Sequence, residues 1–136
     1  MISKGMQQRA GLLFLGRQSG RIFLILENSK WTVPTFPRTG PLLADAEPLL
    51  STYSQGRILP IELYLSADKG FEYGTYVCVV DKEFFGNIDQ TICWANINDL
   101  PNNLHSGLKA TLNNQLIRAK LETIMVLEND SNTQNK

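Results

Sequence analysis

Residues 10–27 read AGLLFLGRQSGRIFLILE, and this stretch decides the fold. Two apolar runs, at 10–15 and 21–27, are joined by a short turn that contains Gly16 and Gly20. Two such runs around a glycine-containing turn predict a β-hairpin. The runs are continuous rather than alternating, which is typical of strands covered on both faces. The chain therefore begins with a hairpin in the middle of a layered structure.

The rest of the chain predicts a mixed sheet with helices packed on it, an α/β fold with a long C-terminal helix. Pro34, Pro37 and Pro41 make residues 28–41 irregular, and Pro48 limits any helix within 42–53 to one or two turns. Pro60 predicts an edge position or a bulge in the next strand. The expected later elements are strands at 57–66, 71–81 and 91–97, a turn at 67–70, and a helix that begins at an N-cap Ser106 and runs to Leu127. Residues 1–128 are expected to form one domain, followed by a flexible polar tail at 129–136.

The bulk composition removes several functional classes. Thirteen basic residues balance thirteen acidic ones, which argues against strong nucleic-acid binding by the whole surface. The two cysteines, Cys78 and Cys93, lie in apolar runs and predict buried free thiols; a disulfide between adjacent strands stays open for an oxidising compartment. Two thiols and one histidine without paired spacing argue against zinc. No signal peptide or membrane-spanning run is visible, so we expect a cytoplasmic protein without a membrane partner.

Several local signatures in the same order resemble the Nudix hydrolase superfamily. They are the opening hairpin, Trp31-Thr32-Val33-Pro34, and the exit of a late strand, Trp94-Ala95-Asn96-Ile97-Asn98-Asp99-Leu100-Pro101. Leu104-His105-Ser106-Gly107-Leu108-Lys109 is similar to the start of the last helix in a phage-type subgroup. The resemblance covers roughly residues 9–121 and implies a Nudix-like mixed sheet between helices.

The chemical signature of that family is absent from the place that it should occupy. In the family, a loop–helix–loop carries Arg-Glu-x-x-Glu-Glu, whose carboxylates gather the divalent cations that activate water. Anchored on Gly56, these positions fall on Leu49-Leu50-Ser51-Thr52-Tyr53-Ser54. Anchored on Gly40, the first Glu falls on Ala46. The resemblance therefore implies a Nudix scaffold with a degenerate signature and no standard metal site.

Some candidate site residues remain. One interpretation makes displaced ligands for Mg²⁺ or Mn²⁺ of four acids, Asp45, Glu47, Glu72 and Asp68. In the other interpretation, Asp45 and Glu47 are two solvated acids on a short helix. The candidate ligand-binding residues are Arg38 for a phosphate, Trp31 for a nucleobase, and Glu72 with Tyr73 on a strand. Each has a structural alternative. Arg38 would be an exposed loop arginine, Trp31 would close the end of the sheet, and Glu72 and Tyr73 would simply alternate between the two faces of a strand. His105 fits a capping or packing role better than that of a general base, and Trp94 fits the core.

Two functional hypotheses follow. The first is a Nudix-fold protein that acts as a non-catalytic binding, regulatory or structural module, with no cofactor. It would take a nucleotide ligand, a protein partner or a second copy, with Phe84-Phe85 as an exposed apolar patch. The alternative is an active Nudix-type hydrolase of nucleoside diphosphate-linked compounds such as ADP-ribose, with the displaced ligands Asp45, Glu47 and Glu72. The phage-type resemblance adds the host cytoplasm or the virion as the expected location.

Overall fold

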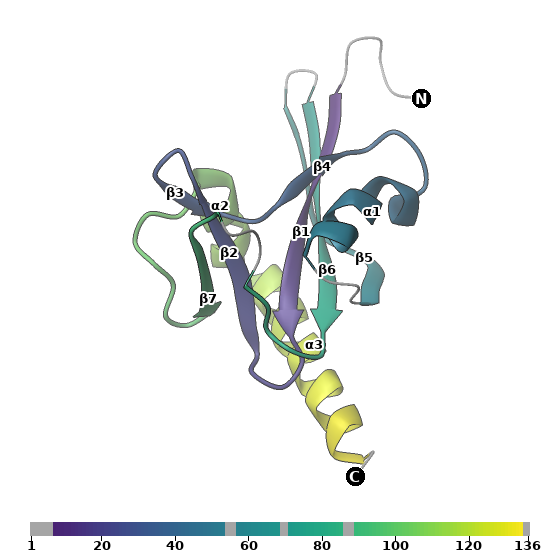
Figure 1. Ribbon diagram of the computed structural model, residues 1–136, viewed down its shortest axis with the longest axis vertical. Helices are drawn as coiled ribbons and strands as arrows, with labels where there is room; N and C mark the ends of the chain where they lie inside the picture. Colours follow the sequence, from purple (N-terminus) through teal and green to yellow (C-terminus); the bar gives the residue numbers. More distant parts are fainter. Residues whose placement is uncertain (1–6, 54–56, 69–70, 86–88, 135–136) are drawn as a thin grey trace.

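The computed structural model describes residues 7–53, 57–68, 71–85 and 89–134; for residues 7, 57–68, 71–73 and 129–134 it describes the backbone only. A mixed sheet lies between helices, as predicted, with the strand order β3-β2-β1-β6-β5 (Figure 1). Two short strands leave this path, since β4 pairs with β1 and β7 pairs with β2. The strands are β1 (Gln7–Gly16), β2 (Arg21–Glu27), β3 (Lys30–Thr32), β4 (Thr35–Pro37), β5 (Arg57–Asp68), β6 (Phe71–Val80) and β7 (Ile92–Asn96). The helices are α1 (Leu42–Thr52), α2 (Ser106–Asn113) and α3 (Gln115–Gln134).

Strand β1 is central and is covered on both faces, which confirms the prediction from its continuous apolar run. It pairs antiparallel with β2 and β4, and parallel with β6 from Gln7↔Phe71 to Gly16↔Val80. Its side chains alternate, so that Leu13 and Leu15 join one core cluster while Leu12 and Phe14 join the other. One strand therefore contributes to two separate cores.

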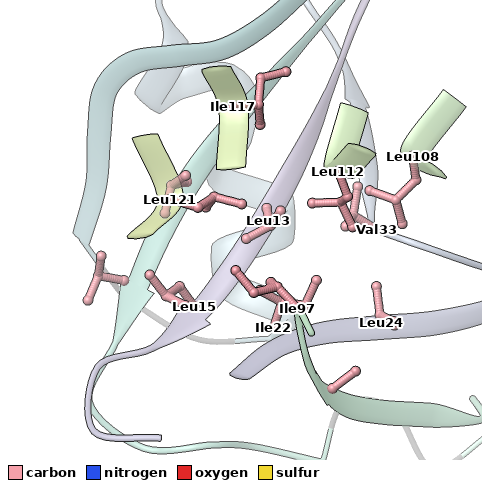
Figure 2. Close-up of a cluster of buried hydrophobic side chains, with 13 residues drawn as sticks. Leu13, Leu15, Ile22, Leu24, Val33, Ile97, Leu108, Leu112, Ile117 and Leu121 are labelled. Atoms are coloured by element: carbon pink, nitrogen blue, oxygen red, sulfur yellow. The ribbon is translucent and has the colours of Figure 1, made fainter. Parts of the chain in front are cut away.

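The first core lies under the two C-terminal helices. Leu112 and Ile117 pack with Leu13 and Leu24 of the sheet, and Val33 closes the cluster beside α2 (Figure 2). Its remaining buried members come from β1, β2, β6, β7 and the residue after β7, and from α2 and α3: Leu15, Ile22, Val77, Val79, Ala95, Ile97, Leu108 and Leu121. Burial of this area is the main stabilising contribution to the position of α2 and α3.

The second core lies on the opposite face under α1. Helix α1 buries Ala46 and Leu50 against the sheet. The remaining buried members come from β1, β2, β4 and β6: Ala10, Leu12, Phe14, Phe23, Ile25, Phe36, Tyr76, Cys78 and Val80. This is the face on which the family resemblance places the metal-binding helix.

The segment 28–41 is more ordered than its prolines predict, because it holds β3 and β4. Asn28 and Ser29 both have positive φ, 51° and 64°, and form the two-residue turn between β2 and β3. The N–H of Leu12 donates to the carbonyl of Pro34 at 2.8 Å, which ties the next stretch to β1. Pairing with a central strand offsets the local effect of the prolines.

Helix α1 is longer than expected, since it spans 11 residues with Pro48 inside. The prediction of one or two turns was therefore wrong. Pro48 has no N–H for the carbonyl of Ala44, but both residues are exposed, so water can solvate that carbonyl. Burial of Ala46 and Leu50 on the other side of the helix offsets the cost.

The single terminal helix predicted from the sequence is two helices. Asn114 separates them, and its Oδ1 accepts hydrogen bonds from the N–H groups of Leu116 and Ile117, which caps the start of α3. The N-cap of α2 is His105 rather than Ser106, since His105 Nδ1 accepts from the N–H of Gly107 at 3.1 Å. Helix α3 runs to Gln134 and so covers most of the segment expected to be a flexible tail.

The expectation for Pro60 is confirmed. β5 lies at the end of the sheet order, and its pairing with β6 shifts register between Ile58 and Glu62 and again before Tyr64. Both cysteines are free, Cys78 buried and Cys93 half-buried. Their strands are not neighbours, because β6 pairs with β1 and β7 with β2, so the open possibility of a disulfide between adjacent strands is excluded. Within the described ranges, no helix is long and apolar enough to cross a membrane.

Candidate functional site

The carboxylate of Asp45 is occupied by the loop that leads into α1. Its Oδ2 accepts from the N–H groups of Thr39 (2.8 Å) and Gly40 (3.0 Å) and from Arg38 Nη1 (2.8 Å), and its Oδ1 accepts from Thr39 Oγ1 (3.2 Å). The backbone N–H groups of Gly40 and Thr39 lower the pKa of Asp45; burial opposes them, and the Thr39 hydroxyl and the Arg38 guanidinium lower the pKa by smaller amounts. Asp45 therefore closes the turn into α1 and is not the solvated acid expected from the sequence.

Arg38 is held in the same network. Its Nη1 also donates to the carbonyl of Gly40 at 3.0 Å, and its guanidinium carbon lies 5.7 Å from the centre of the Tyr76 ring. The side chain is partly buried, so it is not the exposed loop arginine that one interpretation expected. Only part of the guanidinium is engaged in these contacts, and a phosphate role for the rest stays a prediction.

The second half of α1 presents no carboxylate where the family signature would have its glutamates. Leu50 is buried (7% exposed), and Leu49 and Tyr53 are half-buried against the second core. Ser51 and Thr52 are exposed. The side that faces the sheet is thus apolar, and the outer side carries two hydroxyls.

Tyr53 and Phe84 join an aromatic cluster beside the end of α1. The ring of Phe84 lies 4.5 Å from Phe23, 5.1 Å from Phe14, 5.1 Å from Trp94 and 5.9 Å from Tyr53, between ring centres. Trp94 Nε1 donates to the carbonyl of Phe84 at 2.7 Å, which fixes the loop that carries Phe84. Trp94 is therefore a core residue, as predicted.

The expected apolar patch Phe84-Phe85 is wrong in one of its two members. Phe84 is inserted in the aromatic cluster, and only Phe85 is exposed, at 87%. Two adjacent phenylalanines in a loop carry no sequence signal for which of them turns inward, because the rings that receive Phe84 come from β1, β2, β7 and the C-cap of α1. Sequence reasoning also missed Gln90, whose side-chain amide bonds the Tyr53 hydroxyl at 2.8 Å.

The other candidate acids do not form a described site. Glu47 is exposed, and its Oε1 accepts from Ser51 Oγ at 2.8 Å, one helical turn away. Asp68 and Glu72 lie on β5 and β6, where Ala67 pairs with Glu72, but their side chains, like that of Tyr73, lie outside the described residues. Among the side chains that are described, no three of the residue types Asp, Glu, His and Cys gather as a metal ligand set would.

Trp31 and His105 support the start of α2 together. Trp31 lies on β3, half-buried against the first core. Its N–H donates to the carbonyl of Asn103 at 2.7 Å, and its carbonyl accepts from the N–H of His105 at 2.8 Å. Trp31 packs against the first core from β3, and stacking of its ring on a nucleobase stays a prediction; the capping role expected of His105 is confirmed.

Comparison with known proteins shows the fold. No protein-family model matches the chain, and no curated protein matches it at a significant level. A Nudix hydrolase from M. smegmatis, RenU, is 18% identical with a TM-score of 0.67, over 89% of each chain. MutT from Aliivibrio salmonicida and Vibrio cholerae is 13% identical with a TM-score of 0.66, over 84% of this chain and 98% of that one. An ADP-ribose pyrophosphatase from Streptococcus suis is 15% identical with a TM-score of 0.59, over 86% of this chain and 90% of that one. The chain therefore has the Nudix fold, which confirms the fold that the resemblance implied.

Proposed function

We propose that this protein is a Nudix-fold module that binds a ligand or partner without metal-dependent hydrolysis. The observation that carries the proposal is the C-terminal end of α1, where Leu50 in the helix and its C-cap Tyr53 stand at glutamate positions and pack against the core. A carboxylate at a position buried in this way would be desolvated without a counter-charge. The helix covers the sheet and holds no ligand set.

The side chains that the structure describes around α1 do not fit a divalent cation. Mg²⁺ needs an octahedral shell in which the protein supplies at least one or two free carboxylates. The oxygens of Asp45 are already bonded to four donors, and a cation there would have to displace Arg38 and two backbone N–H groups. Glu47 is the one described acid on α1 that remains accessible, and one monodentate carboxylate is a weak site.

The ligand class that we propose to test first is a nucleoside diphosphate compound. The solved structures that share this fold include a protein described as an ADP-ribose pyrophosphatase. Among the described residues, the side-chain hydrogen bonds of Arg38 all start from its Nη1, beside the loop that leads into α1, so the rest of the guanidinium is the part that we propose for a phosphate. Loss of the metal ligands alone would remove the hydrolytic step and would leave a contact between Arg38 and a phosphate of the ligand in place.

The test combines turnover and binding. The full chain is incubated with ADP-ribose and with nucleoside triphosphates, in Mg²⁺ and in Mn²⁺, and products are separated by chromatography. We expect no product above the rate without protein. Calorimetric titration with the same compounds is expected to show binding that Arg38→Ala weakens, and binding without turnover supports a nucleotide-sensing module.

The alternative hydrolase makes a different prediction. Turnover that Glu47→Gln abolishes, with Glu122→Gln on α3 as the exposed matched control, would overturn the proposal. If neither turnover nor nucleotide binding is found, the protein remains a non-catalytic module in this proposal, and its ligand is then a protein partner rather than a nucleotide.

A further inference from the structure

Helix α3 has two apolar faces, and the chain covers only one of them. Ile117 and Leu121 are buried in the first core, and Ile124 packs against it. Arg118 on the same side donates to the carbonyl of Ile97 and to Asn98 Oδ1, which holds α3 against the end of β7. These contacts fix which side of α3 faces the domain. A helix packed on one side is normally polar on the other.

The outward side of α3 is apolar. Leu116, Val126 and Leu127 are 66%, 58% and 63% exposed. Ala119 and Thr123, also exposed, lie between them, so the residues 116, 119, 123 and 126 follow the 3-4-3 spacing of a helix–helix seam. We call these five residues the α3 stripe.

The one polar group in the α3 stripe is already satisfied. Thr123 Oγ1 donates to the carbonyl of Ala119 at 2.8 Å, within the helix. Covering the stripe would therefore leave no unbonded hydroxyl proton behind. The C-terminal turns of α3 extend past the end of the sheet, where no strand or other helix lies beside them (Figure 1). All five residues of the stripe are exposed.

We propose that the α3 stripe binds the same stripe of a second copy of this chain. A two-fold interface requires a self-complementary surface. In an antiparallel pair, Ala119 of one copy meets Thr123 of the other, and Leu116 meets Val126. The two small residues at the centre let the helices approach closely, and the larger residues close the ends.

The size of the stripe fits a weak dimer. Three side chains exposed by about three-fifths leave on the order of 300 Å² of apolar surface per copy. Homodimer interfaces are about 65% apolar, so two stripes correspond to a total buried area of about 900 Å². Specific interfaces begin near about 1,000 Å². We therefore expect association that depends on concentration.

Sedimentation velocity of the full chain tests the proposal, over roughly 10 µM to 1 mM, the range in which a weak interface associates. The mass of the wild-type protein should rise towards that of a dimer. Leu116→Glu and Val126→Glu should each weaken association by at least about tenfold, because each places two charges in the interface. The matched control is Leu43→Glu on α1, since Leu43 is 65% exposed outside the stripe, and it should dimerise as wild type does.

Cross-linking tests the antiparallel arrangement separately. Oxidation of a mixture of Ala119→Cys and Thr123→Cys chains should give more mixed dimer than either variant gives alone. The proposal is overturned if the wild type stays monomeric over the whole range, or if Leu43→Glu weakens association as much as Leu116→Glu does. Neither result bears on hydrolysis, because none of these residues belongs to the candidate site.

Discussion

Replacing Leu50 by glutamate restores the residue type of the Nudix signature, and we expect it to destabilise the fold. Leu50 is 7% exposed beneath α1, so the change removes the burial of a leucine side chain, about 2–3 kcal/mol. It also places a carboxylate among Ala46, Phe14 and Cys78 of the same cluster, which costs about 2–3 kcal/mol even after partial relaxation. The expected loss is about 4–6 kcal/mol, a large part of a typical stability of about 5–15 kcal/mol.

Thermal unfolding followed by circular dichroism gives the measurement. At about 2.1 cal/mol/K per residue, 136 residues have an unfolding entropy of about 0.29 kcal/mol/K. The melting temperature of Leu50→Glu should therefore fall by about 14–21 °C. Thr52→Glu, two residues further along α1 and exposed, is the control and should change the stability by no more than about 0.5 kcal/mol.

Two results would refute the reasoning. One is a Leu50→Glu protein that melts within about 2 °C of Thr52→Glu, since each kcal/mol corresponds to about 3–4 °C here. The other is a Leu50→Glu protein whose melting temperature Mg²⁺ raises while that of the wild type stays constant. The second result would mean that position 50 faces a metal-binding site rather than the core.

Three further predictions concern the start of α1, the turn between β2 and β3, and the cap of α2. Because the pKa of Asp45 is lowered in the folded state, its stabilising effect is present above about pH 4 and is lost as pH falls through the folded value. Urea unfolding of Asp45→Asn should show less stability than wild type at pH 7 and a smaller difference at pH 3. Ser29→Gly should stabilise the fold by about 0.5–1 kcal/mol, because glycine adopts a φ of 64° without strain; Ser29→Ala should not, and an equal gain from both in urea unfolding would contradict this. His105→Ala should cost about 1 kcal/mol through loss of the cap to Gly107, measured by thermal unfolding, and His105→Asn should restore most of it; equal losses would argue against capping.

The sequence was sufficient for those elements whose signal is local or periodic. The hairpin from Ala10 to Glu27 and the irregular edge strand around Pro60 could be predicted, because glycine turns, proline and apolar runs act on their own neighbourhood. The cap at His105 was expected within one residue for the same reason. The fold class followed from the order of these elements.

Elements that depend on distant partners could not be predicted in the same way. Helix α1 continues through Pro48 because Ala46 and Leu50 are buried by strands elsewhere in the chain. Strand β4 forms at Thr35–Pro37 because β1 offers it hydrogen-bond partners. The inward turn of Phe84 depends on four rings, which come from three strands and from the C-cap of α1. Tertiary packing in each case overrides the local propensity.

The candidate site shows why a fold and its chemistry can separate. A helix in this position of the sheet has to bury its inner face, and Ala46 and Leu50 do so here without any acid. The loop before it has to be fixed, and Asp45 does this with hydrogen bonds to Thr39 and Gly40 rather than with a cation. Both requirements of the scaffold are therefore met by apolar packing and hydrogen bonds within the chain. Two of the positions that the signature would fill with glutamates, Leu50 and Tyr53, lie on the inner side, so packing against the sheet and binding a cation make opposite demands on the same side chains.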